Sequence, residues 1–212
     1  MLLGLVRPDA GTATINGSSY ADLAEPLHQV GAVLEASSFH PGRTARNHLR
    51  VQALAAGVDP SRIGDVLGLT GLAEAADRRV GGFSLGMRQR LGLATALLPD
   101  PELLILDEPA NGLDPEGVRW LRDLLRGMAA EGATVLVSSH ILAEVAHSVD
   151  SVVILDGGRL VAQSSLADLT IGAQSATAAT ALPFAAAVAL VAGVAIVVSL
   201  LAARTTLPRD VT

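Results

Sequence analysis

The stretch "LLILDEPANGLDP", from Leu103 to Pro115, decides the fold class of this chain. Its four leading aliphatic residues predict a short strand buried on both faces, as strands are in a parallel sheet covered by helices. Open α/β sheets bind ligands at the carboxyl ends of such strands, where Asp107 and Glu108 follow here. The two carboxylates indicate either a ligand site or a solvated strand end that helps to cap the next helix.

The rest of the chain alternates predicted strands with predicted helices. Strand patterns cover "TATINGSS", "VGAVLE", "ATVLVSSH" and the hairpin "SVVILDGGRLVAQ". Helical periodicity covers residues 41–98, with breaks at glycines, and residues 116–130. The order strand, helix, strand from Leu103 to Ser139, with short connections, implies a right-handed parallel unit. These patterns predict an α/β fold.

Composition limits the classes of function. A length of 212 residues suffices for one well-buried α/β domain with an appendage. The net charge of -6, without a basic cluster, predicts that the chain has no nucleic-acid partner. The absence of cysteine excludes disulfides and thiolate metal sites, which fits a cytoplasmic surface. All 15 basic residues are arginine.

A second segment suggests an anion site. In "FSLGMRQRLGLATALL", from Phe83 to Leu98, Ser84 is a natural N-cap for the helix that follows. The backbone N–H groups of Leu85, Gly86 and Met87 would then point outward at the positive end of the helix dipole, an arrangement that binds phosphate. An ordinary capped amphipathic helix would begin with the same residues, so this segment alone leaves both alternatives open.

Four motifs, in this order, resemble those of the nucleotide-binding subunits of ABC transporters, of the bacitracin and daunorubicin export type. "FSLGM" resembles the family signature, "LLILDEP" the Walker B strand, "NGLDP" the D-loop, and "VLVSSH" the segment that ends in the switch histidine. The resemblance covers about residues 1–170. It implies a P-loop NTPase-like α/β fold with a helical subdomain at about residues 41–98.

The resemblance also implies the chemistry of the site. Asp107 would hold Mg²⁺ through water, Glu108 would polarise the attacking water, and His140 would contact the γ-phosphate of ATP. These roles suit phosphoryl transfer, which needs neutralised phosphate charge and a water held in line.

Further residues would bind the nucleotide or couple two subunits. Ser84 and Gly86 would contact ATP, while Asp114 would couple the two sites of a dimer. Glu35 stands where the family usually has its Q-loop glutamine, from which it could reach Mg²⁺ or its waters. The signature departs from the usual Leu-Ser-Gly-Gly-Gln, because Leu85 and Met87 replace a glycine and the glutamine. The implied partners are a second nucleotide-binding subunit and a membrane permease, at the cytoplasmic face of the cell membrane.

The phosphate-binding loop of the family, G-x-x-x-x-G-K-[ST], does not occur in these residues, which contain no lysine. The resemblance implies that the chain begins inside the helix after this loop, with the first strand and the loop missing and "LLGLVRPDAG" as the tail of that helix. A misplaced start or a decayed copy would explain this. Three functions stay open: an exporter ATPase that is inactive in this form, a catalytically dead membrane-tethered subunit that contributes Ser84 and Gly86 to a partner's ATP site, and a non-functional gene fragment.

The segment "FAAAVALVAGVAIVVSLLAA", from Phe184 to Ala203, predicts a transmembrane helix. No charged residue occurs between Leu169 and Ala203. As a helix, the segment would be about 30 Å long, the thickness of the hydrocarbon core of a bilayer. A buried core helix is the alternative. The prediction makes residues 171–183 a linker and gives the chain a membrane anchor.

Overall fold

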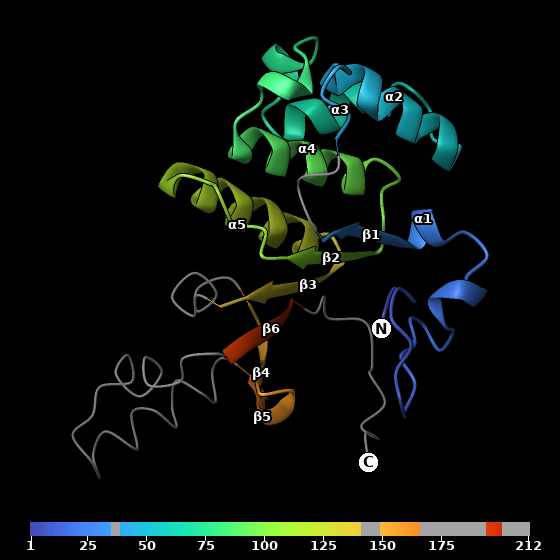
Figure 1. Cartoon of the computed structure of the whole chain (residues 1–212), viewed down its shortest axis with the longest axis vertical. Coiled ribbons are helices and arrows are strands. Elements are labelled where there is room, and N and C mark those ends of the chain that lie inside the picture. Colours follow the sequence, from blue (N-terminus) through green and yellow to red (C-terminus); the bar gives the residue numbers. More distant parts are fainter. Residues whose placement is uncertain (35–38, 141–148, 166–193, 201–212) are drawn as a thin grey trace.

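A computed structural model describes residues 1–34, 39–140, 149–165 and 194–200 (Figure 1). The helices, with 3₁₀ turns written η, and the strands are, in chain order, η1 Tyr20–Asp22, α1 Pro26–Gln29, β1 Val30–Val33, α2 Ala45–Ala56, α3 Arg62–Leu69, η2 Ala73–Ala75, η3 Val80–Gly82, α4 Leu85–Leu97, β2 Leu103–Asp107, α5 Pro115–Ala130, β3 Thr134–Ser139, β4 Ser151–Asp156, β5 Arg159–Ser165 and β6 Val194–Leu200.

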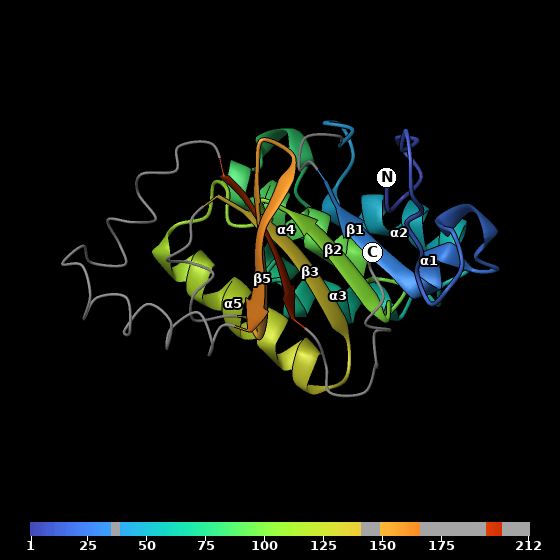
Figure 2. The same cartoon turned by 90° about the horizontal axis from the view of Figure 1, so that it is seen from below.

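These strands form one mixed sheet in the order β1-β2-β3-β6-β4-β5. Strands β1, β2 and β3 are parallel to one another, while β6 runs antiparallel to both β3 and β4. The predicted unit of strand, helix and strand is β2, α5 and β3, and it is parallel as expected. The carboxyl ends of β2 and β3 therefore meet at one edge of the sheet (Figure 2).

Both faces of β2 are covered, as its aliphatic sequence predicts. Leu104 and Leu106 belong to the main core, which also contains residues of α4 and α5. Ile105 points to the opposite face and packs in a smaller cluster with residues near the amino terminus, including Leu2 and Leu3. Because β2 is buried from both sides, the position of its carboxyl end is fixed by packing on the two faces.

Helices α2, α3 and α4 lie on the same side of the sheet as α5, and α4 packs directly against β1 (Figure 1). The predicted breaks at glycines are real helix ends: Gly57 (φ 66°) ends α2 and Gly71 (φ 67°) follows α3, both in the left-handed conformation that glycine adopts without strain. The helices predicted within residues 41–98 are thus confirmed, whereas the division of the chain into subdomains stays a prediction.

The amino-terminal expectations were wrong in detail. No helix forms over residues 1–11, where Gly4 (φ 71°) and Gly11 (φ 81°) have left-handed backbones and Pro8 lacks the N–H that a helix interior needs. The predicted strand "TATINGSS" is reduced to a single bridge between Ile15 and Ser18. The side chain of Ile15 packs in the smaller cluster with Val30 of β1 and Ile105 of β2.

The predicted transmembrane helix over residues 184–203 is also wrong as one continuous helix, because Val194–Leu200 is strand β6, hydrogen-bonded between β3 and β4. The β-branched valines and isoleucine of this segment favour a strand over a helix. The rest of the segment, and the linker at residues 171–183, lie outside the described residues. Among those that are described, no helix is long and apolar enough to cross a membrane.

Candidate functional site

Three of the predicted site residues lie together where β2 and β3 end. Asp107 is the last residue of β2 and pairs in register with Ser138 of β3. Glu108 follows directly, and its carboxylate Oε1 lies 2.8 Å from Nδ1 of His140, which follows β3. The parallel register therefore brings Asp107, Glu108 and His140 to one edge of the sheet.

Ser138 links the two carboxylate residues, and sequence reasoning did not select it. Its hydroxyl donates a hydrogen bond to Oδ1 of Asp107. The same Oγ accepts from the backbone N–H of Glu108 at 3.1 Å, and the carbonyl oxygen of Ser138 accepts from that N–H at 3.2 Å. The signal that could have found Ser138 is the register between β2 and β3, which places it opposite Asp107.

The backbone of Glu108 is left-handed, with φ 46°. Few residues other than glycine, asparagine and aspartate adopt this conformation, and strained backbones of this kind cluster at functional sites. The side chain is partly exposed, at 31%, and His140 is more exposed, at 60%. A ligand arriving from solvent can therefore reach both side chains.

The contact between Glu108 and His140 indicates which imidazole nitrogen of His140 donates a hydrogen bond. An ionised carboxylate can only accept hydrogen bonds, so Nδ1 of His140 donates to Oε1 of Glu108. The contact holds the imidazole ring beside the carboxylate at the end of β3.

The residues at this edge suit a magnesium ion that arrives with a nucleotide. The described part of the chain has no group of three or more histidine, aspartate or glutamate residues that could hold a metal by themselves. Mg²⁺ typically keeps several waters and binds one or two carboxylates plus the phosphates of its substrate. Asp107, exposed at the end of β2, offers such a carboxylate. Glu35 lies outside the described residues.

The amino terminus of α4 has the predicted cap. Ser84 Oγ accepts from the backbone N–H of Met87 at 3.2 Å. One of the three N–H groups expected to point outward is thus used in the cap, which leaves those of Leu85 and Gly86, in the first turn, without an acceptor inside the helix.

Gly86 and Leu85 pack against the turn that follows β2. A Cβ on Gly86 would lie 3.0 Å from the carbonyl oxygen of Gly112. A Cβ on Gly112 (φ 77°) would overlap the side chain of Leu85. Because Gly86 has no side chain, α4 can pack closely against this turn. The same lack of a side chain would also let a ligand approach.

Asp114 caps α5. Its Oδ1 accepts from the backbone N–H of Gly117 at 2.7 Å. This side chain therefore has a local structural task, which does not test the predicted coupling across a dimer.

Comparison with known proteins identifies the family. The family model described as "ABC transporter" matches residues 1–111. The bacitracin transport ATP-binding protein BcrA of Bacillus licheniformis is 44% identical over 163 residues, which are 76% of this chain and 53% of the relative. The lantibiotic transport ATP-binding protein SrtF of Streptococcus pyogenes is 37% identical over 161 residues, 76% of this chain and 69% of the relative.

A solved structure, titled "Structure of ATP binding subunit of ABC transporter", has the same fold. It is 32% identical, with a TM-score of 0.71, over 81% of this chain and 73% of that one. The chain spans about half the length of BcrA, at 53%. Its motifs, its sheet and these relatives together show that the chain belongs to the ATP-binding subunits of the ABC transporter family.

Proposed function

We propose that this chain is the nucleotide-binding part of an ABC exporter, which binds ATP with Mg²⁺ and hydrolyses it to drive transport through a separate membrane permease. The observation that carries the proposal is the cluster of Asp107, Glu108, Ser138 and His140 at the carboxyl ends of two parallel strands. The names of the relatives BcrA and SrtF, which refer to bacitracin and lantibiotic transport, support export as the direction.

The proposed roles follow from the chemistry of each group. Bound Mg²⁺ would neutralise charge on the phosphates. Asp107 would hold the ion through water, and Glu108 would accept a hydrogen bond from the attacking water and orient it. His140, kept beside Glu108 by their 2.8 Å contact, would reach the γ-phosphate.

The remaining roles involve partners. The N–H groups at the start of α4, with Ser84 and Gly86, would contact ATP held by a second nucleotide-binding subunit. Asp114, in the turn before α5, would couple the two sites, and Glu35 would act on the waters of Mg²⁺. The permease would hold the subunit at the cytoplasmic face of the membrane.

The lack of lysine in these 212 residues bears on activity. Without a P-loop lysine and its loop backbone, the β- and γ-phosphates are not held beside Asp107 and Glu108. We therefore expect no measurable ATPase from the 212-residue chain alone. Fusion of the first strand through the G-K-[ST] segment of the BcrA relative to its amino terminus should restore hydrolysis; this protein is called the P-loop fusion below.

Variants of the P-loop fusion test the roles. Glu108→Gln should abolish turnover but keep ATP binding, because the amide keeps the shape and loses the charge. Ser84→Ala should weaken hydrolysis through the opposite subunit. Hydrolysis by the unfused chain that depends on Glu108 would contradict the expected need for the P-loop. A fusion that binds ATP without hydrolysing it would contradict the proposal.

The same lack of lysine favours a second candidate, a catalytically dead subunit that completes an ATP site on an intact partner. Mixing the chain with an intact relative whose own signature serine has been replaced by alanine distinguishes the two. Restored hydrolysis that is lost with Ser84→Ala in this chain would support the second candidate.

A further inference from the structure

We propose that Ser138 is a positioning residue of this site, whose hydroxyl fixes the carboxylate of Asp107 and the backbone of Glu108 at the same time. The inference deepens the proposed function, on which it rests. Ser138 lies within the segment "VLVSSH", but the resemblance assigned it no role, and the proposal rests on the hydrogen bonds at the ends of β2 and β3.

The direction of the hydrogen bonds follows from the single proton of a hydroxyl group. Because Oγ of Ser138 accepts from the N–H of Glu108 at 3.1 Å, its own proton is available for Oδ1 of Asp107, where the structure places the next bond. The hydrogen bonds therefore run from Glu108 N–H through Ser138 to Asp107. The N–H of Glu108 orients the hydroxyl of Ser138, and that hydroxyl orients the carboxylate of Asp107.

The first consequence concerns Asp107. A bond to Oδ1 restrains rotation of the carboxylate and leaves Oδ2 available to a cation or its water shell. Asp107 and Ser138 are register partners on adjacent parallel strands, so their side chains lie on the same face of the sheet. This orientation is set before any ligand binds.

The second consequence concerns Glu108. Its left-handed backbone, with φ 46°, is held by an N–H group that reaches both the carbonyl oxygen and the hydroxyl of Ser138. Its carboxylate is held by His140. The end of β3 thus fixes Glu108 at both its backbone and its side chain.

Three variants separate positioning from a general loss of stability. Ser138→Ala removes the hydroxyl, and Ser138→Thr keeps it on a β-branched residue that suits a strand. Thr134→Val, at the opposite end of β3, is the matched control for losing a strand hydroxyl away from the site.

The first measurement is amide hydrogen exchange of Glu108 by NMR in the 212-residue chain. A hydrogen bond of ordinary net strength predicts that Ser138→Ala speeds this exchange by about fivefold. Ser138→Thr and Thr134→Val should change it by less than about twofold. The N–H of Gly117, bonded to Asp114, reports whether the whole chain has been loosened. Unchanged exchange of Glu108 in Ser138→Ala would overturn the inference.

The second measurement is the Mg²⁺ concentration for half-maximal ATPase in the P-loop fusion. Ser138→Ala should raise it by about fivefold, on the same hydrogen-bond strength, and Ser138→Thr should restore it. An unchanged Mg²⁺ requirement in an active Ser138→Ala fusion would overturn the positioning role. An inactive fusion with the natural Ser138 would instead refute the proposed function, and the exchange of Glu108, which needs no nucleotide, would then decide the inference.

Discussion

Among single residues, Glu108 combines an acidic side chain with a backbone conformation that favours glycine, at φ 46°. The left-handed conformation costs an L-residue about 1 to 2 kcal/mol. The hydrogen bond that the Glu108 N–H donates to Ser138 and the contact of its carboxylate with His140 offset part of that cost. The structure therefore places backbone strain at the residue proposed to orient the attacking water.

Glu108→Gly should be more stable than Glu108→Ala by about 1 kcal/mol, because alanine keeps the left-handed strain and glycine does not. Both variants lose the contact with His140, so the comparison isolates the backbone. Urea unfolding measures the difference. On the exposed face of α5, Arg126→Gly should be less stable than Arg126→Ala by about 1 kcal/mol. Equal stability of the two variants at position 108 would contradict the strain.

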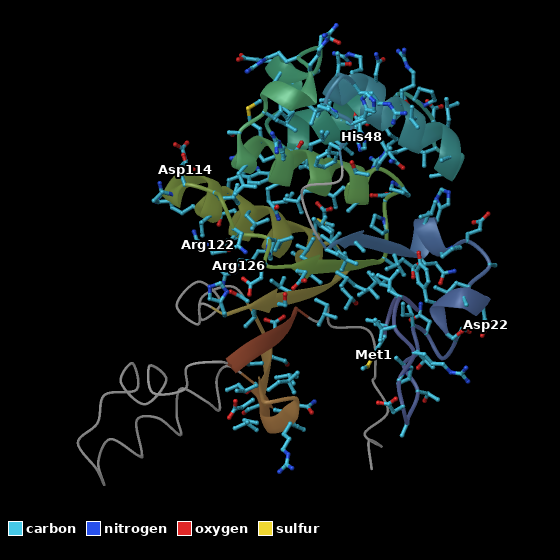
Figure 3. All side chains as sticks on the ribbon, in the orientation of Figure 1. Met1, Asp22, His48, Asp114, Arg122 and Arg126 are labelled. Carbon is cyan, nitrogen blue, oxygen red and sulfur yellow. The ribbon has the colours of Figure 1, made fainter. Side chains whose placement is uncertain are left out.

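His48 is a second residue whose environment has a measurable consequence. It lies in the helical layer (Figure 3), is 6% exposed, and its Nε2 is 3.1 Å from Oγ1 of Thr95. The ring of Phe39 meets it edge-on at 5.0 Å between centroids. Burial, and then repulsion from Arg43, lower the pKa of His48 below its ordinary value.

Because the pKa of the folded His48 is lowered, acid should decrease the free energy of unfolding of this protein. Below about pH 6.5 this histidine binds a proton in the unfolded chain, whereas the folded His48 stays neutral until the pH reaches its lowered pKa. Proton binding then favours the unfolded state, so the free energy of unfolding decreases as the pH is lowered through this range. Urea unfolding should give a lower free energy of unfolding at pH 5 than at pH 7. His48→Gln should flatten this slope. A slope that survives in His48→Gln would assign the pH dependence to other groups.

Among the elements, α4 and the turn after β2 depend on each other. Gly86, in the first turn of α4, faces the carbonyl oxygen of Gly112, which a Cβ would approach to 3.0 Å. This contact is tighter than most Cβ contacts, and backbone on one side limits how far it can relax.

Gly86→Ala should lower the free energy of unfolding by about 1 to 3 kcal/mol, the usual cost of overpacking. Gly64, in α3, is the matched control because a Cβ there meets nothing within 4 Å. Gly64→Ala should raise stability by about 0.5 to 1 kcal/mol through helix propensity. If Gly86→Ala is as stable as Gly64→Ala, the α4 contact is not tight, and the glycine would then be explained by ligand approach alone.

The elements also show what could be predicted from the sequence. Strand β2 and the cap of α4 follow from local patterns, an aliphatic run and an N-cap serine. The cap of α5 is Asp114, and neither Asp107 nor Glu108 serves as that cap. Ser138 could not be distinguished from Ser139 by its letter, since only the register with β2 decides which hydroxyl meets Asp107. Strand β6 was mistaken for part of a helix because a long apolar run has no period of its own.

At the scale of the whole molecule, the sheet depends on a strand from far along the chain. In the described sheet, β6 lies between the parallel part, β1 to β3, and the hairpin of β4 and β5, and it pairs with β3 on one side and β4 on the other. The amino-terminal segment covers one face near β1 and β2, where Leu2 and Leu3 pack, although Met1, Leu5 and Val6 stay exposed. The apolar start of the chain is therefore only partly left in water.

Removal of β6 should uncover two strand edges at once, because both β3 and β4 would lose their partner. Unpaired edges template association between chains. We expect a chain that ends at residue 193 to be more strongly associated in size-exclusion chromatography with light scattering than a chain that ends at Leu200. The two share the apolar stretch before Val194, so the difference reports β6 and not general hydrophobicity. The longer chain should also unfold at a higher temperature. If the two chains elute and melt alike, β6 does not hold the two halves of the sheet together.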